Sequence, residues 1–461
     1  MFFLVNIIII NFIYSIIVLP LRKTQLKINI ANSNEFINYY LSNNLYTIIK
    51  IGEPSQNLEV SIKEEPTVFS INSFYCNLNK FYNRNISKTF INLTKFEENI
   101  FNFYDCCIAQ ESFYFYTDLD LKKEKKFQNI KFIYEKEKKV GNEIYNSNCA
   151  KISLGFINYY NEKNDYDFIT ELKKLDLINE YTWTVKFVEN DKNNDIEGYL
   201  IIGDYPHTYD NINYNEINLR ATVNNMEENN WNLEFMKITV NDTQLTHYMI
   251  GVISFDKNYI IGTEEYKAVI NSMFFNKYIY DGICFEDNIN SHYFLFYCKS
   301  NLFNKEDIAQ FPSLNFFHFQ YNFTFSFNGS DLFFENNGYF YFLVIFDRYN
   351  YRNWNLGKLF LKKYQLIFNH DSKMISYYLE NNEVNNKDDN GQIKNKDIII
   401  IILIIIVLIS FIVGVAIGKF IYDNKKKKAK EMKEEYLYKK SESFEDSDKI
   451  EQNKVIDSIN T

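Results

Sequence analysis

The clearest indication of the fold lies in residues 45–65, which read LYTIIKIGEPSQNLEVSIKEE. Two strand-like runs, 45–51 and 57–62, flank a turn that contains Gly52 and Pro54. Short runs of this kind, separated by turn residues, are typical of β-strands, and similar runs recur as far as residue 378. The sequence therefore predicts a mainly β body.

In one segment the apolar residues are spaced as in a helix. Between Asp167 and Leu177, apolar residues recur near helical spacing at Phe168, Leu172 and Leu175. We expect one helix in this window, between strand-like segments on either side.

The stretch at 45–65 resembles the pepsin-like aspartic peptidase family. In that family a strand, a Gly-x-Pro-x-Gln turn and a second strand lead to a catalytic Asp-Thr-Gly. Counted without a gap from Gln56, the three positions hold Lys63, Glu64 and Glu65. A second run, Gly251 to Thr263, resembles the surroundings of the second Asp-Thr-Gly, and there the positions hold Ser254, Phe255 and Asp256.

Further segments match the family in the expected order. They are Ser153–Phe156, Tyr181–Phe187, Gly198–Asp204, Asn230–Val240, Phe311–Phe316, Trp354–Tyr364 and Ile367–Asn369. The resemblance covers residues 45–378. It implies a bilobal acid-protease fold, in which two β lobes related by a pseudo-twofold each supply one loop to a central cleft.

Both ends of the chain carry membrane signals. An apolar run, Phe2–Leu19, is followed by Arg22 and Lys23 and predicts a signal peptide, with a first membrane anchor as the alternative. Ile398–Gly418 is uncharged, and its roughly 21 residues at ~1.5 Å each can span the ~30 Å hydrocarbon layer. The lysines that follow, Lys419 and Lys425–Lys428, indicate a cytosolic tail.

The expected protein is therefore a single-pass type I membrane protein with a lumenal or extracellular body. Its expected parts are a signal peptide (1–21), an N-terminal lobe (45–215), a C-terminal lobe (216–380), a stalk (381–397), a transmembrane helix (398–422) and a cytoplasmic tail (423–461). Charged residues make up 24% of the chain, which argues against global disorder, and the net charge of −9 argues against a nucleic-acid partner.

The cysteines and glycosylation sequons agree with this compartment. The resemblance implies a disulfide between Cys284 and Cys298. Adjacent Cys106 and Cys107 are poorly placed to bond to each other, so Cys76 and Cys149 would each take one of them; the alternative is free buried thiols. Five asparagines begin Asn-x-Ser/Thr and are candidate glycosylation sites: Asn85, Asn92, Asn241, Asn322 and Asn328.

The residues at the expected active site do not fit the family's chemistry. An aspartic peptidase uses two carboxylates that share one proton and activate a water. Lys63 is a cation, and Ser254 has no useful acidity. The flap tyrosine candidate is Tyr104, in a segment without glycine, and Ser153 replaces a family glycine in the first lobe. We therefore expect no catalytic residue at these positions.

Three functions remain compatible with this pattern. The first is a non-catalytic ectodomain that binds a peptide or protein in the inter-lobe cleft. The second is an active aspartic endopeptidase, in which Glu64 or Glu65 meets Asp256. The third is a hydrolase with Ser254 as nucleophile and Lys63 as base. The plain alternative for Lys63 is an ion pair with one of the neighbouring carboxylates.

Two further expectations concern the cleft. Lys63 and Ser254 should lie opposite each other at its floor, and aromatic side chains or an extended peptide segment should occupy it. Disulfides at Cys106 and Cys107 would stiffen the flap. The five histidines, His207, His247, His292, His318 and His370, lack metal-ligand spacing, so we expect no metal and no cofactor.

Overall fold

The structure is a computed structural model. It describes residues 16–23, 45–63, 69–72, 82–94, 106–135, 150–155, 167–188, 196–223, 230–255, 257–288, 293–348, 353–379, 419, 422, 424–428, 430 and 432–433. Residues 1–384 belong to one compact unit and residues 385–461 to another. The first unit carries the fold.

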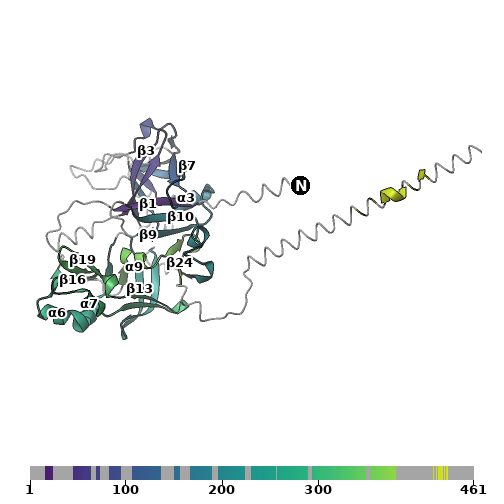
Figure 1. The fold of residues 1–461 in the computed structure, drawn as a ribbon. Helices are drawn as coiled ribbons and strands as arrows, with labels where there is room; N and C mark the ends of the chain where they lie inside the picture. Colours follow the sequence, from purple (N-terminus) through teal and green to yellow (C-terminus); the bar gives the residue numbers. More distant parts are fainter. Residues whose placement is uncertain are drawn as a thin grey trace, which may run out of the picture. The chain divides into compact units, whose positions relative to one another are not determined.

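This unit is built mainly from two large β-sheets (Figure 1). The first has 13 strands in the order β11 (Leu219–Val223), β24 (Met374–Tyr378), β23 (Ile367–Asn369), β9 (Thr182–Phe187), β10 (Ile196–Ile202), β1 (Ile17–Lys23), β2 (Leu45–Ile51), β3 (Gln56–Lys63), β8 (Ala150–Ser153), β4 (Ser70–Asn72), β7 (Glu124–Glu135), β6 (Cys106–Tyr116) and β5 (Ile91–Asn92).

The second sheet has 11 strands. Its order is β18 (Phe323–Phe327), β17 (Leu314–His318), β12 (Asn232–Val240), β13 (Thr243–Ile253), β22 (Asn353–Leu356), β14 (Ile260–Gly262), β21 (Val344–Asp347), β16 (Tyr293–Lys299), β20 (Tyr339–Phe342) and β19 (Phe333–Asn336), with β15 (Cys284–Asn288) paired to β16. The prediction of a mainly β body is confirmed.

The two sheets do not correspond to the chain segments before and after residue 215, the predicted boundary between the lobes. Strands β11, β23 and β24 come from the segment predicted as the C-terminal lobe, yet all three belong to the first sheet. Asn369 of β23 pairs with Thr182 of β9, and Val223 of β11 pairs with Met374 of β24. The first sheet therefore combines both halves of the sequence.

Strand β1 lies inside the first sheet, between β10 and β2 (Figure 1). Ile17 to Leu21 pair with β10 in antiparallel register, and Arg22 pairs with Tyr46 of β2. Ile17, Val18 and Leu21 are fully buried. A signal peptide that ended at residue 21 would remove most of this strand, so that boundary does not fit the sheet.

The same pairing pattern occurs twice. In the first sheet β2 pairs antiparallel with β3, β3 parallel with β8, β8 antiparallel with β4, and β4 parallel with β7. In the second sheet β12, β13, β22, β14 and β21 repeat these pairings in the same order and directions. The chain thus contains an internal structural repeat.

The predicted helix is present as α3 (Phe168–Lys174). Asp167 caps it by accepting a hydrogen bond from the Thr170 amide, as a short polar residue does at a helix start. Phe168 packs on Phe69 with ring centroids 4.9 Å apart, so α3 covers the first sheet. The amphipathic spacing that predicted the helix is what lets it bury one face.

Other helical segments lie mostly in the second half. They are α4 (Pro206–Tyr209), α5 (Glu264–Ile270), the π-helical η4 (Asn271–Phe275), α6 (Asn276–Tyr280), α7 (Lys305–Ala309), α8 (Gly329–Leu332) and α9 (Lys358–Lys363), with 3₁₀ turns η1 (Arg84–Ile86), η2 (Glu216–Asn218) and η5 (Phe319–Tyr321). The continuous run from α5 to α6 was not predicted.

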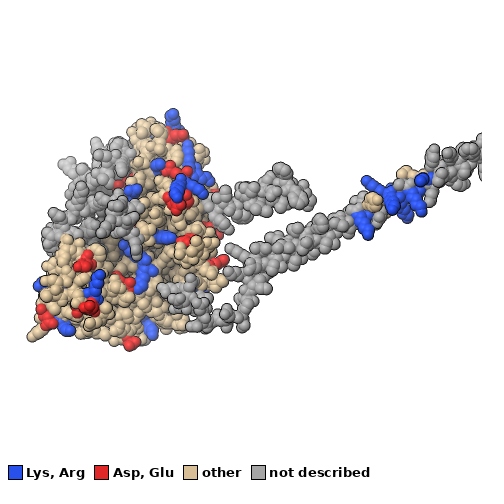
Figure 2. Space-filling model, in the orientation of Figure 1, with Lys and Arg blue, Asp and Glu red and all other residues tan. Residues whose placement is uncertain are grey.

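The second unit contains the predicted cytoplasmic tail. Its described residues are helical and include Lys425–Lys428; Figure 2 shows the lysines of this unit in blue. The predicted stalk and nearly all of the predicted transmembrane helix fall outside the described residues. Within the part of the chain that the structure describes, no helix has the length and apolar character needed to cross a membrane.

Candidate functional site

Lys63 and Ser254 occupy equivalent positions of the internal repeat. Lys63 ends β3 and pairs with Ser153 of β8 in parallel register. In the second repeat, Ile253 of β13 pairs with Leu356 of β22, so the next residue, Ser254, lies against Gly357. Ser153 and Gly357 are therefore equivalent in the repeat as well.

Hydrogen bonds confirm this register. The Leu154 amide donates to the Lys63 carbonyl oxygen at 2.8 Å, and the Ser254 amide donates to the Leu356 carbonyl oxygen at 3.0 Å. In a parallel pair, one residue bonds to the two residues that flank its partner, so both bonds fit the same alignment. The two equivalent positions of the repeat therefore hold an amine and a hydroxyl.

Ser153 and Gly357, which lie against Lys63 and Ser254, differ in the space around them. A Cβ on Gly357 would lie 2.1 Å from the Tyr259 carbonyl oxygen and 2.5 Å from that of Lys257, so only glycine fits there. Ser153 keeps a side chain at the equivalent position and is 1% exposed. Its Oγ accepts a hydrogen bond from the Gly155 amide at 3.4 Å. The first repeat thus accommodates a buried hydroxyl where the second repeat excludes any side chain.

Phe255, which follows Ser254, belongs to a buried aromatic cluster. We define the central aromatic cluster as Trp183, Trp231, Phe255 and Phe368. Trp183 stacks on Phe368 with centroids 4.0 Å apart, and Phe255 meets Trp183 edge-on at 5.1 Å. The four side chains are at most 1% exposed. The residue that follows Ser254 is therefore a ring in a dry, apolar environment.

The same cluster also contacts the segment beside Lys63. Trp231 Nε1 donates to the Leu154 carbonyl oxygen at 2.7 Å, and Trp231 meets Trp183 edge-on at 5.8 Å. His370 Nε2 lies 3.3 Å from the Gly155 carbonyl oxygen. One cluster therefore touches the neighbours of both equivalent positions, and joins the two sheets at that point.

Several predicted site residues lie outside the described residues. These are Glu64, Glu65, Tyr104, Asp256, Cys76 and Cys149. The predicted ion pair of Lys63 with its neighbouring carboxylates and the flap role of Tyr104 therefore stay predictions. Lys63 itself is half-buried, whereas Ser254 is 5% exposed.

The predicted disulfide between Cys284 and Cys298 is confirmed. The two residues are directly paired in strands β15 and β16, with their Cα atoms 3.9 Å apart. The bond closes this hairpin covalently.

The prediction that Cys107 forms a disulfide is wrong, because Cys107 is a free, buried thiol. Its Sγ donates a hydrogen bond to Asn92 Oδ1 at 3.3 Å, and burial raises the pKa of the thiol to about 11. Cys107 pairs with Tyr134 in the β6–β7 hairpin and lies in the hydrophobic core. Strand β6 therefore has no disulfide at Cys107, and the alternative of a buried thiol holds for this residue.

A buried carboxylate that the sequence did not indicate lies in the first sheet. Glu111 of β6 is 1% exposed and accepts hydrogen bonds from the hydroxyls of Tyr82 (2.5 Å), Ser87 (2.6 Å) and Thr89 and from the Ser112 amide (2.7 Å). Burial, together with Glu111, raises the pKa of Tyr82 far above its usual range. These bonds hold residues 82–89 against β6.

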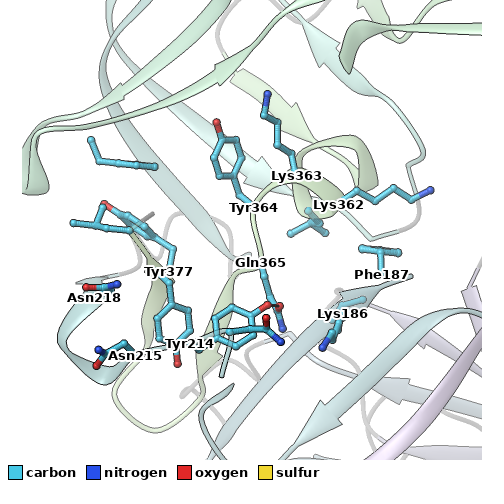
Figure 3. A pocket seen from close by; sticks show the side chains of 16 residues that line it. Lys186, Phe187, Tyr214, Asn215, Asn218, Lys362, Lys363, Tyr364, Gln365 and Tyr377 are labelled. Carbon is cyan, nitrogen blue, oxygen red and sulfur yellow. Dashed lines mark hydrogen bonds between the residues drawn. The ribbon is translucent and has the colours of Figure 1, made fainter. Parts of the chain in front are cut away.

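Two pockets on the described part of the chain lie away from Lys63 and Ser254. One, of about 440 Å³, is bordered by β9, α9, β24 and the segment 213–218, and is shown in Figure 3. Tyr214, on one side of it, donates a hydrogen bond to Gln365. Lys186 also lines this pocket and forms an ion pair with Asp210 at 3.1 Å. The other pocket, of about 550 Å³, lies between α7, α8 and the β19–β20 hairpin.

All five sequon asparagines are exposed. Asn85 lies in η1, Asn92 in β5, Asn241 in the β12–β13 turn, Asn322 after η5 and Asn328 before α8. Each is therefore sterically open to modification.

No family model matches this chain, and no curated protein matches it. Solved structures do. Basic 7S globulin from soybean is 12% identical and gives a TM-score of 0.53, over 80% of this chain and 97% of the globulin. Conglutin gamma from lupine seeds is 11% identical and gives a TM-score of 0.55, over 81% of this chain and 97% of conglutin gamma. At this identity the likeness concerns the fold alone, so the chain folds like these two globulins.

Proposed function

We propose that this protein is a pepsin-like, bilobal ectodomain that has no aspartic peptidase activity and binds a peptide or protein between its lobes. The observation that carries the proposal is the equivalence of Lys63 and Ser254 in the internal repeat. The pseudo-twofold that relates the lobes is the one that this repeat implies.

The chemistry at these positions supports inactivity. Activation of a water by this family requires one carboxylate as base and a second as acid. A lysine ammonium is not a base, and a serine hydroxyl does not supply the acid. The hydroxyl that follows the second carboxylate in the family is replaced by the Phe255 ring, which is 1% exposed.

The packing supports a binding role for the retained fold. The central aromatic cluster is buried and hydrogen-bonded to Leu154, so it supports the backbone next to both positions from beneath. A backbone that is held rigid before binding loses little entropy when a ligand docks on it. An extended peptide would bind here through backbone hydrogen bonds to strand edges, with side-chain pockets that set its preference.

We further propose that the ectodomain is lumenal or extracellular and anchored by the segment 398–422. A cleavage site upstream of Ile17 would keep β1 in the first sheet. N-terminal sequencing of the protein purified from membranes tests this point. The expected first residue lies at or before Ile17, and a mature chain that begins at residue 22 contradicts the placement of β1.

Peptide binding is tested by equilibrium binding of a fluorescent peptide library to the full-length protein in detergent. We expect a subset of peptides to be retained intact, and the substitution Ser254→Trp to abolish their binding. Tyr280→Trp, at a side chain that is 91% exposed, serves as the control. If no peptide binds, or if binding is unchanged in Ser254→Trp, the proposed site is wrong.

The same incubation separates the alternative functions by mass spectrometry. Cleavage that disappears with Asp256→Asn identifies an aspartic endopeptidase with displaced carboxylates. Cleavage that disappears with both Ser254→Ala and Lys63→Ala identifies a Ser-Lys hydrolase.

A further inference from the structure

The pocket between α7, α8 and the β19–β20 hairpin has an apolar wall and a glycosylation sequon at its edge. Its lining includes Ile308, Phe333 and Phe340, together with Asn328. These three apolar side chains are 6–8% exposed, so each presents a small part of its surface to the pocket. An apolar pocket of about 550 Å³ is large enough for a sugar residue.

Asn328 is oriented by the start of α8. Its Oδ1 accepts hydrogen bonds from the Asp331 backbone amide at 3.2 Å and from Ser330 Oγ at 2.6 Å. The Asn328 backbone amide donates to Asp331 Oδ2 at 2.9 Å. This capping box engages Oδ1 with the helix end, so Nδ2 is the arm of the amide that points away from it. Nδ2 is the atom that N-glycosylation modifies.

The middle residue of the sequon fixes the edge of the pocket. A Cβ on Gly329 would lie 1.9 Å from the Ile308 carbonyl oxygen, so α7 and α8 pack in backbone contact through this glycine. Asn328 is therefore held at the rim, beside the apolar wall that α7 contributes. The other four sequon asparagines do not line this pocket.

The chemistry of the pocket suits a pyranose ring. The C–H face of N-acetylglucosamine is apolar and packs on aromatic carbons, while its hydroxyls need polar partners. Phe333 and Phe340 supply the aromatic carbons, and Lys305 and Glu335 supply charged groups at the exposed rim. Polar groups around an apolar wall are typical of a site that orients a small ligand.

We propose that Asn328 carries an N-linked glycan whose first N-acetylglucosamine packs in this pocket and covers Phe333 and Phe340. The inference rests on the proposed lumenal location. In the modification, a bond forms between Asn328 Nδ2 and the sugar C1, and Nδ2 loses a proton. The bond between C1 and the pyrophosphate oxygen of a lipid-linked donor of the secretory pathway breaks.

The test uses the full chain purified from eukaryotic secretory cells and compares three samples by hydrogen exchange. The first is intact, the second is trimmed with an endoglycosidase to one N-acetylglucosamine per site, and the third is fully deglycosylated, which converts Asn328 to Asp and keeps a helix-capping carboxyl oxygen. We expect the first two to exchange alike. In the third, the amides of α7 and β20 should exchange about 5-fold faster, because the ring that covers them is lost.

Variants separate this sugar from the other glycans. Ser330→Ala removes the sequon and should reproduce the fast exchange of α7 and β20, Ser330→Thr should restore slow exchange, and Thr243→Ala, which removes the Asn241 sequon, should change neither element. The proposal is overturned if Asn328 is unmodified in molecules that carry glycans at other sequons, or if complete deglycosylation leaves α7 and β20 unchanged. Absence of glycan at all five sequons overturns the lumenal location as well.

Discussion

Trp231 Nε1 donates a hydrogen bond of 2.7 Å to the Leu154 carbonyl oxygen, and the Leu154 amide in turn donates to Lys63. Trp231 immediately precedes β12, the first strand of the second repeat, whereas Leu154 follows β8 of the first. A single side chain thus connects the second repeat to the backbone beside the first candidate position.

This bond gives a first prediction. Trp231→Phe keeps an aromatic ring in the central cluster but leaves the buried Leu154 carbonyl without its donor. A lost hydrogen bond of this kind costs about 1–3 kcal/mol, and the smaller ring adds to the loss. Urea unfolding followed by circular dichroism measures the change; a variant as stable as wild type would show that the bond contributes nothing.

Phe255 gives a second prediction. Phe255→Thr introduces the residue type that the resemblance implies at this position, yet it removes a ring packed 5.1 Å from Trp183 and 5.8 Å from Phe368. We expect it to lower the free energy of unfolding by about 3–5 kcal/mol, as large-to-small core changes do. Phe319→Ala, at a side chain that is 68% exposed, should change it by less than about 0.5 kcal/mol. Equal effects of the two substitutions would contradict the cluster.

The pH dependence of stability gives a third prediction. His318 is 3% exposed and lies 3.3 Å from the Tyr377 hydroxyl; burial lowers its pKa, and Glu234 partly opposes this. As the pH falls below about 6.5, the ordinary pKa of histidine, His318 is protonated in the unfolded chain while it is still neutral in the folded protein. This favours the unfolded state, so the contribution of His318 to stability falls as the pH falls. Above that pH both states hold it neutral, and the contribution is constant.

His318→Gln removes this titration. We expect wild type to lose more stability than the variant between pH 7.5 and pH 5.5, because other titrating groups, such as buried Glu171, are shared by both proteins. Parallel stability curves over this interval would show that His318 has an ordinary pKa.

Cysteine chemistry gives a fourth prediction. Cys107 should resist iodoacetamide in the native protein, with a rate at least about 100-fold below that in denaturant, because its thiol is buried and its pKa is raised to about 11. In denaturant without reductant, Cys107 should be alkylated while Cys284 and Cys298 are not. Peptide mass spectrometry identifies the modified residues, and protection of Cys107 until a reductant is added would mean that it is in a disulfide.

The sequence predicted strands, α3 and the Cys284–Cys298 bond because each has a local signal. The helical run from α5 to α6 also had one: Thr263 caps α5 by accepting from the Tyr266 amide, and Tyr266, Ile270, Phe274 and Tyr278 recur every four residues. We did not predict this helix because many aromatic residues surround the spacing, and an aromatic-rich composition favours strands.

Other features depend on contacts between distant segments and have no local signal. The pairing of β1 with β10 joins residues about 180 positions apart, and an apolar run that enters a central strand looks like the apolar core of a signal peptide. The Glu111 hydrogen bonds depend on Tyr82, Ser87 and Thr89, which come from a separate segment. The equivalence of Lys63 and Ser254 could be predicted from sequence because strand, turn and strand are contiguous; the aromatic cluster could not.

The central claim, that Lys63 and Ser254 replace a catalytic carboxylate pair, is tested most directly by a peptidase assay on the full-length protein. Hydrolysis of a broad peptide mixture is followed by mass spectrometry from pH 3 to pH 7, with and without a transition-state peptide inhibitor of aspartic peptidases. We predict no inhibitor-sensitive cleavage at any pH. Inhibitor-sensitive cleavage that survives Lys63→Ala and is lost in Asp256→Asn would contradict the claim.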